Sequence, residues 1–196
     1  MIHPDIKYGV ISAAELKIDR RELAARVGAG IDYSSDSLTD LVKRFEQNSN
    51  YRYAYCKLPV NVSKAICDLG FARVESRDLA SLLTGCKEAI ILAVSVGIGV
   101  DRLIARLEAT SRADAFFADA IGSAAAESLC DLVCKQLEAE HSCTGRFSPG
   151  YGDFPLEFQR ELLSRLNADA SVGITLNSSL LMTPMKSITA VIGIKE

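Results

Sequence analysis

Apolar residues along this chain recur at two different periods, and the period separates expected helices from expected strands. Spacings of three and four residues place apolar side chains on one face of a helix, whereas alternation with polar residues places them on one face of a strand. The helical spacing covers residues 19–28, 37–48, 76–85 and 155–167. Residues 101–140 contain no proline and also follow the helical period, which predicts a long helical region with a break near Ser111.

The strand-like segments lie between these helices. Apolar alternation or a continuous apolar run predicts strands over residues 51–58, 88–96, 173–176 and 187–194. Pro59 ends the first of them, and residues 61–74 follow neither period. Helices and strands do not alternate regularly, so the predicted fold class is α+β, with a mixed, largely antiparallel sheet and the long helix packed against it.

Composition and charge narrow the possible functions. The chain has 196 residues, of which 48% are hydrophobic, and no linker-like stretch divides it, so we expect a single domain over residues 1–196. Basic and acidic residues number 22 and 25 without any basic block, which argues against nucleic acid as a partner. The longest apolar run, residues 89–100, is shorter than the ~20 residues that a membrane span needs. Because the N-terminus lacks a signal-peptide pattern, we expect a cytoplasmic protein that makes no membrane contact.

The six cysteines include no CxxC pair, and we expect them to be reduced. Cys130, Cys134, His141 and Cys143 form the one arrangement with metal-like spacing, and a zinc module there is the alternative to buried thiols. We predict no metal site, because free cysteine is among the residue types most often buried. His3 and His141 lie in no metalloprotease pattern and no serine lies in a G-x-S-x-G elbow, so no catalytic residue is predicted.

A buried strand meets a helix at Gly97-x-Gly99, an arrangement that dinucleotide-binding loops share. Those loops need a third glycine for close helix packing, and Arg102 occupies that position here. We therefore expect a tight strand-to-helix connection, in which the missing side chains let another chain segment or a ligand approach the backbone.

A run of small residues, 122–126, precedes Glu127 on the long helix. Small side chains let another element pack closely, and in that interpretation Glu127 is a solvated surface acid. The alternative is a functional carboxylate, although the helical face that it shares with Ser123 and Cys130 holds little that would pair with it.

The stretch GRFSPGYGDFPLEF, residues 145–158, lies between two helical segments and carries the strongest candidate chemistry. Arg146 stands at the head of this loop, and its planar guanidinium suits a carboxylate or a phosphate. Pro149 and Gly150 set a turn whose backbone a ligand can approach closely, and Tyr151 can stack on a flat ring. The alternative is a rigid surface loop whose arginine binds a backbone carbonyl.

These residues resemble the activation, or reactivation, domain of cobalamin-dependent methionine synthase. The S-adenosylmethionine loop of that family reads R-x-x-P-G-Y-P, and residues 146–152 here read RFSPGYG. The family follows the loop with an amphipathic helix and a G-x-x-L-T-E-S-x-A-M-x-P-x-x-S-V-S-G segment, to which residues 173–190, GITLNSSLLMTPMKSITA, are similar at the same distance. The helix at 117–131 also resembles the family's A-D-x-L-A-E-A-x-x-E-x-L helix. The resemblance covers residues 100–194, whereas residues 1–75 match poorly.

The resemblance implies an activation-domain-like fold that binds S-adenosylmethionine and presents its methyl group to cob(II)alamin. The cofactor-binding positions that it implies are Arg146, Ser148, Pro149, Gly150, Tyr151 and Glu127. Arg146 would bind the methionine carboxylate, and the backbone of 148–151 would line the adenine and the ribose. Tyr151 would face the corrin, and Glu127 would bind the ligand's amino group or its ribose hydroxyls.

Two positions depart from the family. Ser123 replaces an acid one turn before Glu127, so Glu127 must take over that role, and Thr183 replaces an aromatic residue. The poor match of residues 1–75 is the third departure, and it leaves another aspartate of the family without an assigned counterpart here. The D-x-H-x-x-G loop with which cobalamin-carrying modules of this class bind cobalt is also absent, because neither His3 nor His141 lies in that pattern.

The resemblance therefore implies a free-standing reactivation subunit that contacts cobalamin only through a partner protein. That partner would be a methionine synthase lacking its own activation domain, or another corrinoid protein, and the electron donor would be of the flavodoxin or ferredoxin type. Methyl transfer would then depend on proximity rather than on a general acid or base. The alternative from another class is a non-catalytic sensor or interaction protein that binds S-adenosylmethionine or a related nucleoside.

Overall fold

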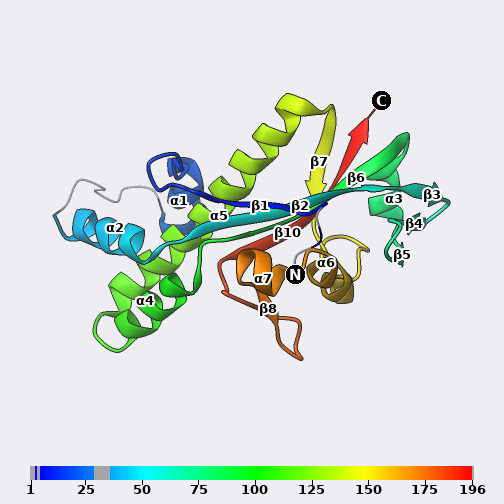
Figure 1. Ribbon diagram of the computed structural model, residues 1–196. Helices are drawn as coiled ribbons and strands as arrows, with labels where there is room; N and C mark the ends of the chain where they lie inside the picture. The colour runs from blue at the N-terminus through cyan, green and yellow to red at the C-terminus, as the bar shows by residue number, and fades with distance from the viewer. Residues whose placement is uncertain (1–2, 4, 29–35, 196) are drawn as a thin grey trace.

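The computed structural model describes residues 3, 5–28 and 36–195, and its centre is a five-stranded sheet (Figure 1). The strands lie in the order β1-β2-β6-β10-β7, and each neighbouring pair is antiparallel. Their bounds are β1 (Lys7–Ile11), β2 (Tyr51–Pro59), β6 (Cys86–Ser95), β10 (Ser187–Lys195) and β7 (Cys143–Phe147). The strands predicted at 51–58, 88–96 and 187–194 are confirmed as the three central ones.

Strand β6 is buried on both faces because it lies in the middle of the sheet. Its alternate side chains enter two separate cores, Ile90, Leu92 and Val94 on one face and Ala89, Ile91 and Ala93 on the other. Burial on both faces explains why this segment reads as a continuous apolar run rather than as an alternating one.

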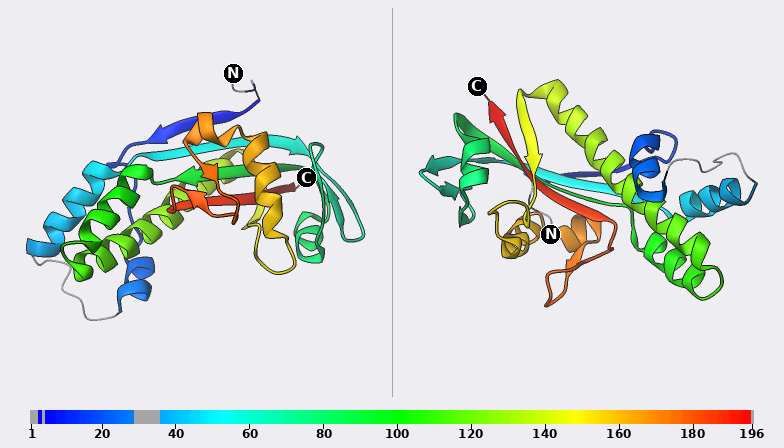
Figure 2. Two further views of the ribbon diagram at one scale, coloured as in Figure 1. Left: turned by 90° about the horizontal axis from the view of Figure 1, so that it is seen from below. Right: turned by 180° about the vertical axis from the view of Figure 1, so that it is seen from behind.

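Helices cover both faces of the sheet. One face packs against α1 (Arg20–Val27), α2 (Asp36–Asn48), α4 (Ile98–Glu108) and α5 (Arg112–Glu140). The other face packs against α3 (Arg77–Leu83), the 3-10 turn η1 (Leu156–Phe158), α6 (Gln159–Arg165) and α7 (Ala168–Val172). The long helix α5 crosses its face diagonally, as both Figure 1 and Figure 2 show. This arrangement confirms the predicted α+β class with a long helix packed on the sheet.

The long helical region is interrupted at the predicted position. Helix α4 ends at Glu108, and the Ser111 hydroxyl accepts a hydrogen bond from the backbone N–H of Asp114 at 3.3 Å, which caps the start of α5. Serine is favoured at this position because its oxygen satisfies an N–H that has no partner within the helix. Although α5 runs for 29 residues, no helix in the described part of the chain is apolar enough over its length to cross a membrane.

The sequence pattern did not reveal the smaller strands. Residues 61–75 form a three-stranded antiparallel sheet of β3 (Asn61–Ser63), β4 (Ile66–Asp68) and β5 (Arg73–Glu75). The strand predicted at 173–176 is shorter than expected, since only β8 (Thr175–Leu176) pairs, with β9 (Met182–Thr183). The beginning of the stretch 145–158 also differs from the prediction, because residues 143–147 form the edge strand β7.

Two glycines at the start of α4, Gly97 before it and Gly99 in its first turn, allow a close approach between two segments of the chain. A Cβ atom added to Gly99 would lie 2.2 Å from the carbonyl oxygen of Asn48, at the end of α2. The backbone N–H of Asn50 donates to the carbonyl of Val96 at 2.7 Å in the same region. The expected tight strand-to-helix connection is therefore present, and the element that approaches the backbone is the end of α2.

We predict that Gly99→Ala destabilises the protein by about 1–3 kcal/mol, because the clash is with a backbone atom that cannot rotate away. Alanine is intrinsically better than glycine in a helix by about 1 kcal/mol, so a net loss means that the clash outweighs this gain. Urea unfolding measures the change. The matched control is Gly145→Ala, where an added Cβ has no neighbour within 4 Å; equal stability of the two variants would contradict the prediction.

Candidate functional site

A cleft of about 450 Å³ opens at the edge of the sheet where β7 ends. Its lining residues are Glu127, Arg146, Phe147, Ser148, Pro149, Tyr151, Gln159, Met182, Ser187, Ile188 and Thr189. Strand β7 stops at Phe147, which pairs with Val191, so the part of β10 before Val191 has β6 on one side and no paired strand on the other. The cleft lies beside this uncovered edge.

The structure brings together five of the six residues that were predicted as a binding site. Arg146, Ser148, Pro149 and Tyr151 line the cleft from β7 and the following turn, and Glu127 lines it from α5. The sixth, Gly150, belongs to the same turn but does not line the cleft, and it is exposed.

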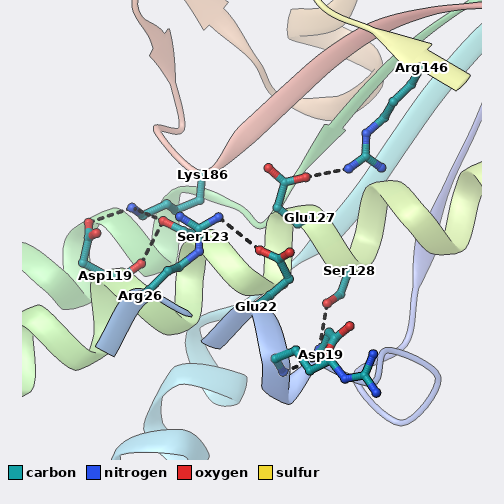
Figure 3. A network of polar contacts seen from close by, with 10 residues as sticks. Asp19, Glu22, Arg26, Asp119, Ser123, Glu127, Ser128, Arg146 and Lys186 are labelled. Atoms are coloured by element: carbon teal, nitrogen blue, oxygen red, sulfur yellow. Dashed lines mark hydrogen bonds and ion pairs between the residues drawn. The ribbon is translucent and has the colours of Figure 1, made fainter. Parts of the chain in front are cut away.

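Arg146 joins the edge strand to the long helix. Its Nη2 donates to Glu127 Oε2 at 2.7 Å, as Figure 3 shows, and its Nη1 donates to Asp131 Oδ1 one helical turn further along α5. The helical face that Glu127 shares was expected to hold little that would pair with a carboxylate, and the observed partner comes from another element, strand β7. The sequence could not show this partner, because it comes from a strand that packs beside α5 only in the folded chain.

These contacts hold Arg146 in its charged form. Burial by itself would lower the pKa of the guanidinium, but the neighbouring Cys130 thiol and the carboxylates of Asp131 and Glu127 raise it above its ordinary value. The side chains of Arg146 and Glu127 are 28% and 32% exposed, so each ion pair contributes only about 0–1 kcal/mol to stability. One positive and two negative charges leave the group of Arg146, Glu127 and Asp131 with a net charge of −1.

The turn after β7 is fixed to the start of α3. Asp153 accepts hydrogen bonds from the Ser76 hydroxyl at 2.5 Å and from the backbone N–H of Arg77 at 2.7 Å. Gly152 has a φ of +52°, and a Cβ atom there would lie 2.1 Å from the Asp78 carboxylate. Contact with α3 thus explains Gly152 and Asp153 in this stretch.

The same turn presents an exposed tyrosine on a rigid base. Its backbone closes through Gly150 N–H to Phe154 C=O at 2.8 Å and Phe154 N–H to Tyr151 C=O at 2.9 Å. Phe154 is buried and stacks on Phe147, with ring centroids 5.9 Å apart. Tyr151 itself is 66% exposed at the mouth of the cleft, so its ring is free to contact another molecule.

Three lining residues that were not predicted as site residues, Gln159, Ser187 and Thr189, are buried and polar, and two of them have no hydrogen-bond partner in the described chain. Gln159 and Thr189 are 4% and 3% exposed, and neither side chain makes a hydrogen bond to another residue of the described chain. The signal for Gln159 was present in the sequence, since it occupies a position on the apolar stripe of its helix with Leu162 and Leu166. A glutamine on such a stripe is a departure from the hydrophobic pattern.

Ser123, which stands where the related family has an acid, does not line the cleft. Its hydroxyl is a hydrogen-bond partner of the Lys186 ammonium at 3.0 Å, and Lys186 also binds Asp119 at 2.6 Å (Figure 3). The stem of Lys186 passes over Gly122, where an added Cβ would lie 3.1 Å from it. The run of small residues on α5 therefore makes room for this lysine.

The cysteines next to the cleft form a thiol pair. The contact with Cys130, together with the charge of Arg146, lowers the pKa of Cys134 against the opposing effect of burial. Within residues 3, 5–28 and 36–195, no group of three or more His, Cys, Asp or Glu side chains is placed to hold a metal ion. The predicted alternative of a zinc module thus finds no support in this part of the chain.

The fold of this chain, an antiparallel sheet with a long helix across one face, matches that of a solved domain. The solved crystal structure of the MetH reactivation domain bound to AdoHcy is similar to this fold, with a TM-score of 0.74 over 96% of this chain and 78% of that chain. The two sequences are 14% identical over this match. No protein-family model matches the sequence, and no curated protein matches it. Since the alignment covers 96% of this chain, it must include most of residues 1–75, where the sequence resemblance was poor.

We predict that Asp153→Asn destabilises the protein at neutral pH, and that this effect disappears in acid. Hydrogen bonds from Ser76 and Arg77 hold the pKa of Asp153 below its ordinary value of 3.8. A carboxylate whose pKa is depressed by folding stabilises the protein above its unfolded pKa and loses this effect as the pH falls through its folded pKa.

Thermal unfolding from pH 7 to pH 2 tests this prediction. The difference in Tm between the wild-type protein and Asp153→Asn should be largest at pH 7 and should shrink below pH 4. Asp40→Asn is the matched control, because Asp40 is exposed and makes no polar side-chain contact with another described residue. A pH-independent difference in Tm for Asp153→Asn would contradict the assignment.

Proposed function

We propose that this protein binds S-adenosylmethionine in the cleft and presents its methyl group to a corrinoid held by another protein. The observation that carries the proposal is the Arg146–Glu127 ion pair beside the PGY turn, in a fold similar to a domain that was crystallised with AdoHcy. The partner would be a methionine synthase without its own activation domain, or another corrinoid protein, acting in the cytoplasm with a flavodoxin or ferredoxin as electron donor.

The ion pair suits the amino-acid end of the ligand. An α-amino acid carries a carboxylate and an ammonium group on the same carbon, and Arg146 and Glu127 present the opposite charges 2.7 Å apart. The ligand's carboxylate would bind Arg146, and its ammonium group would bind Glu127. The Arg146–Glu127 ion pair of the free protein would be replaced by an ion pair from each residue to the ligand. Neither Arg146 nor Glu127 is then left without a partner.

Net charge favours the methylated form of the ligand. S-Adenosylmethionine carries a sulfonium and an ammonium against one carboxylate, which gives a charge of +1, whereas S-adenosylhomocysteine is neutral. The group of Arg146, Glu127 and Asp131 has a charge of −1, so Coulomb attraction adds to the affinity for the sulfonium form.

The mouth of the cleft suits the partner's cofactor. The corrinoid, held by the partner protein and reduced by one electron, would supply the cobalt centre that accepts the methyl group. This chain would orient the sulfonium through Arg146 and Glu127, and the exposed ring of Tyr151 would contact the flat macrocycle. Proximity and orientation are then the whole catalytic contribution of the protein.

Calorimetric titration with S-adenosylmethionine tests the binding half of the proposal. We predict that Arg146→Ala weakens binding about 30-fold, or about 2 kcal/mol, the low end of the range for a charged partner because Arg146 is 28% exposed. Arg102→Ala is the control, since Arg102 is exposed and makes no polar side-chain contact with another described residue. Absence of binding by the folded wild-type protein would refute the proposed function.

Methyl transfer to a methionine synthase lacking its activation domain tests the second half. With a reductant present, the change in the absorbance of the partner's cobalamin reports methylation. We predict that Tyr151→Ala binds S-adenosylmethionine normally but lowers the methylation rate about 100-fold, because the two cofactors are no longer aligned. Tyr8→Ala is the control, since Tyr8 is 54% exposed on β1. Saturable binding without any transfer by the wild-type protein would instead indicate a sensor.

A further inference from the structure

The two ends of the cleft lie on opposite faces of the sheet. Glu127 reaches it from α5, on the face covered by the long helix, whereas Gln159 reaches it from α6, on the other face. Along β10, Val191 enters the core on the α6 side and Ile192 the core on the α5 side, so strand alternation places Thr189 on the α6 side with Gln159. A ligand in the cleft would therefore pass across the uncovered edge of β10.

The α6 end of the cleft contains polar groups that the protein itself does not satisfy. Gln159 and Thr189 are 4% and 3% exposed as whole residues and line the cleft, and neither side chain bonds to another described residue. Ser187, their neighbour, differs in this respect, because its hydroxyl donates to the carbonyl of Pro184 at 2.8 Å. Among the described residues only Asp101 Oδ1 is a fully buried side-chain polar atom without a hydrogen-bond partner, so the polar atoms of Gln159 and Thr189 are open to the cleft. A ligand in the cleft can therefore bind to these free donors and acceptors.

We infer that Gln159, assisted by Thr189, is the specificity-determining residue for the base of the bound nucleoside. A glutamine amide offers a donor and an acceptor side by side, and the edge of an aminated purine offers the complementary pair, an exocyclic amino group beside a ring nitrogen. The inference rests on the proposed function, since it assigns the nucleoside end of the ligand to the α6 side and leaves the amino-acid end with Arg146 and Glu127.

The test compares S-adenosylhomocysteine with its analogue that lacks the 6-amino group, both titrated calorimetrically. The 6-amino group belongs to both purine edges that combine an amino group with a ring nitrogen. The analogue therefore loses one hydrogen bond whichever of these two edges Gln159 contacts. The wild-type protein should bind the amino compound about 10- to 100-fold more tightly. Gln159→Leu, which keeps the volume but not the amide, should bind both compounds with nearly equal affinity.

A readout without ligand separates this role from a structural one. Replacing an unpartnered buried amide with an apolar side chain should leave the Tm of the free protein unchanged or raise it, whereas a structural glutamine would lower it on removal. Gln136→Leu on α5 is the matched control, because Gln136 is exposed. Gln159→Met serves as a second near-isosteric variant should Gln159→Leu fail to fold.

The outcomes distinguish the two levels of the proposal. If the folded wild-type protein binds neither compound, the proposed function itself fails. If it binds both equally, or if Gln159→Leu and Gln159→Met keep the full preference for the amino compound, the role of Gln159 is overturned while nucleoside binding stands. Loss of the preference together with an undiminished Tm supports the inference.

Discussion

The position of the edge strand β7 relative to the long helix α5 determines the cleft, and Arg146 links the two elements. Backbone pairing fixes β7 on one side only, against β10. On the other side Arg146 reaches α5 and binds Glu127 and Asp131. Because β7 ends one residue later, the same arrangement leaves the edge of β10 open. One side chain thus joins the two layers and places a charged group at the opening between them.

An ordered turn lies at one end of this opening, and polar side chains without partners in the described chain lie at the other. The turn that carries Tyr151 is fixed through Asp153 to the start of α3, so little further ordering is needed when a molecule contacts the tyrosine. Gln159 and Thr189, in contrast, bond to no other described residue and present their polar atoms to the cleft at the opposite end. Ordered backbone and free polar side chains together suit a binding site.

The similarity to the MetH reactivation domain shows how little sequence identity this fold requires. At 14% identity the two chains still share the sheet and the helix across it, because a fold depends on the pattern and volume of core residues more than on their identity. Function depends on specific side chains at a site. For that reason the binding assignment rests on Arg146, Glu127 and the turn, and on the experiments that test them, rather than on the shared fold.

The sequence by itself determined the elements that carry their own periodicity, which are the central strands, the main helices and the break at Ser111. Sequence motifs also selected residues that the fold gathers around one cleft. Only the tertiary structure decided that 143–147 and 7–11 are strands, because edge strands such as β1 bury few side chains and depend on backbone pairing with distant segments. The tertiary structure likewise decided that Glu127 pairs with Arg146 and that the Gln159 side chain bonds to no other described residue. Ion pairing and burial depend on which elements lie side by side.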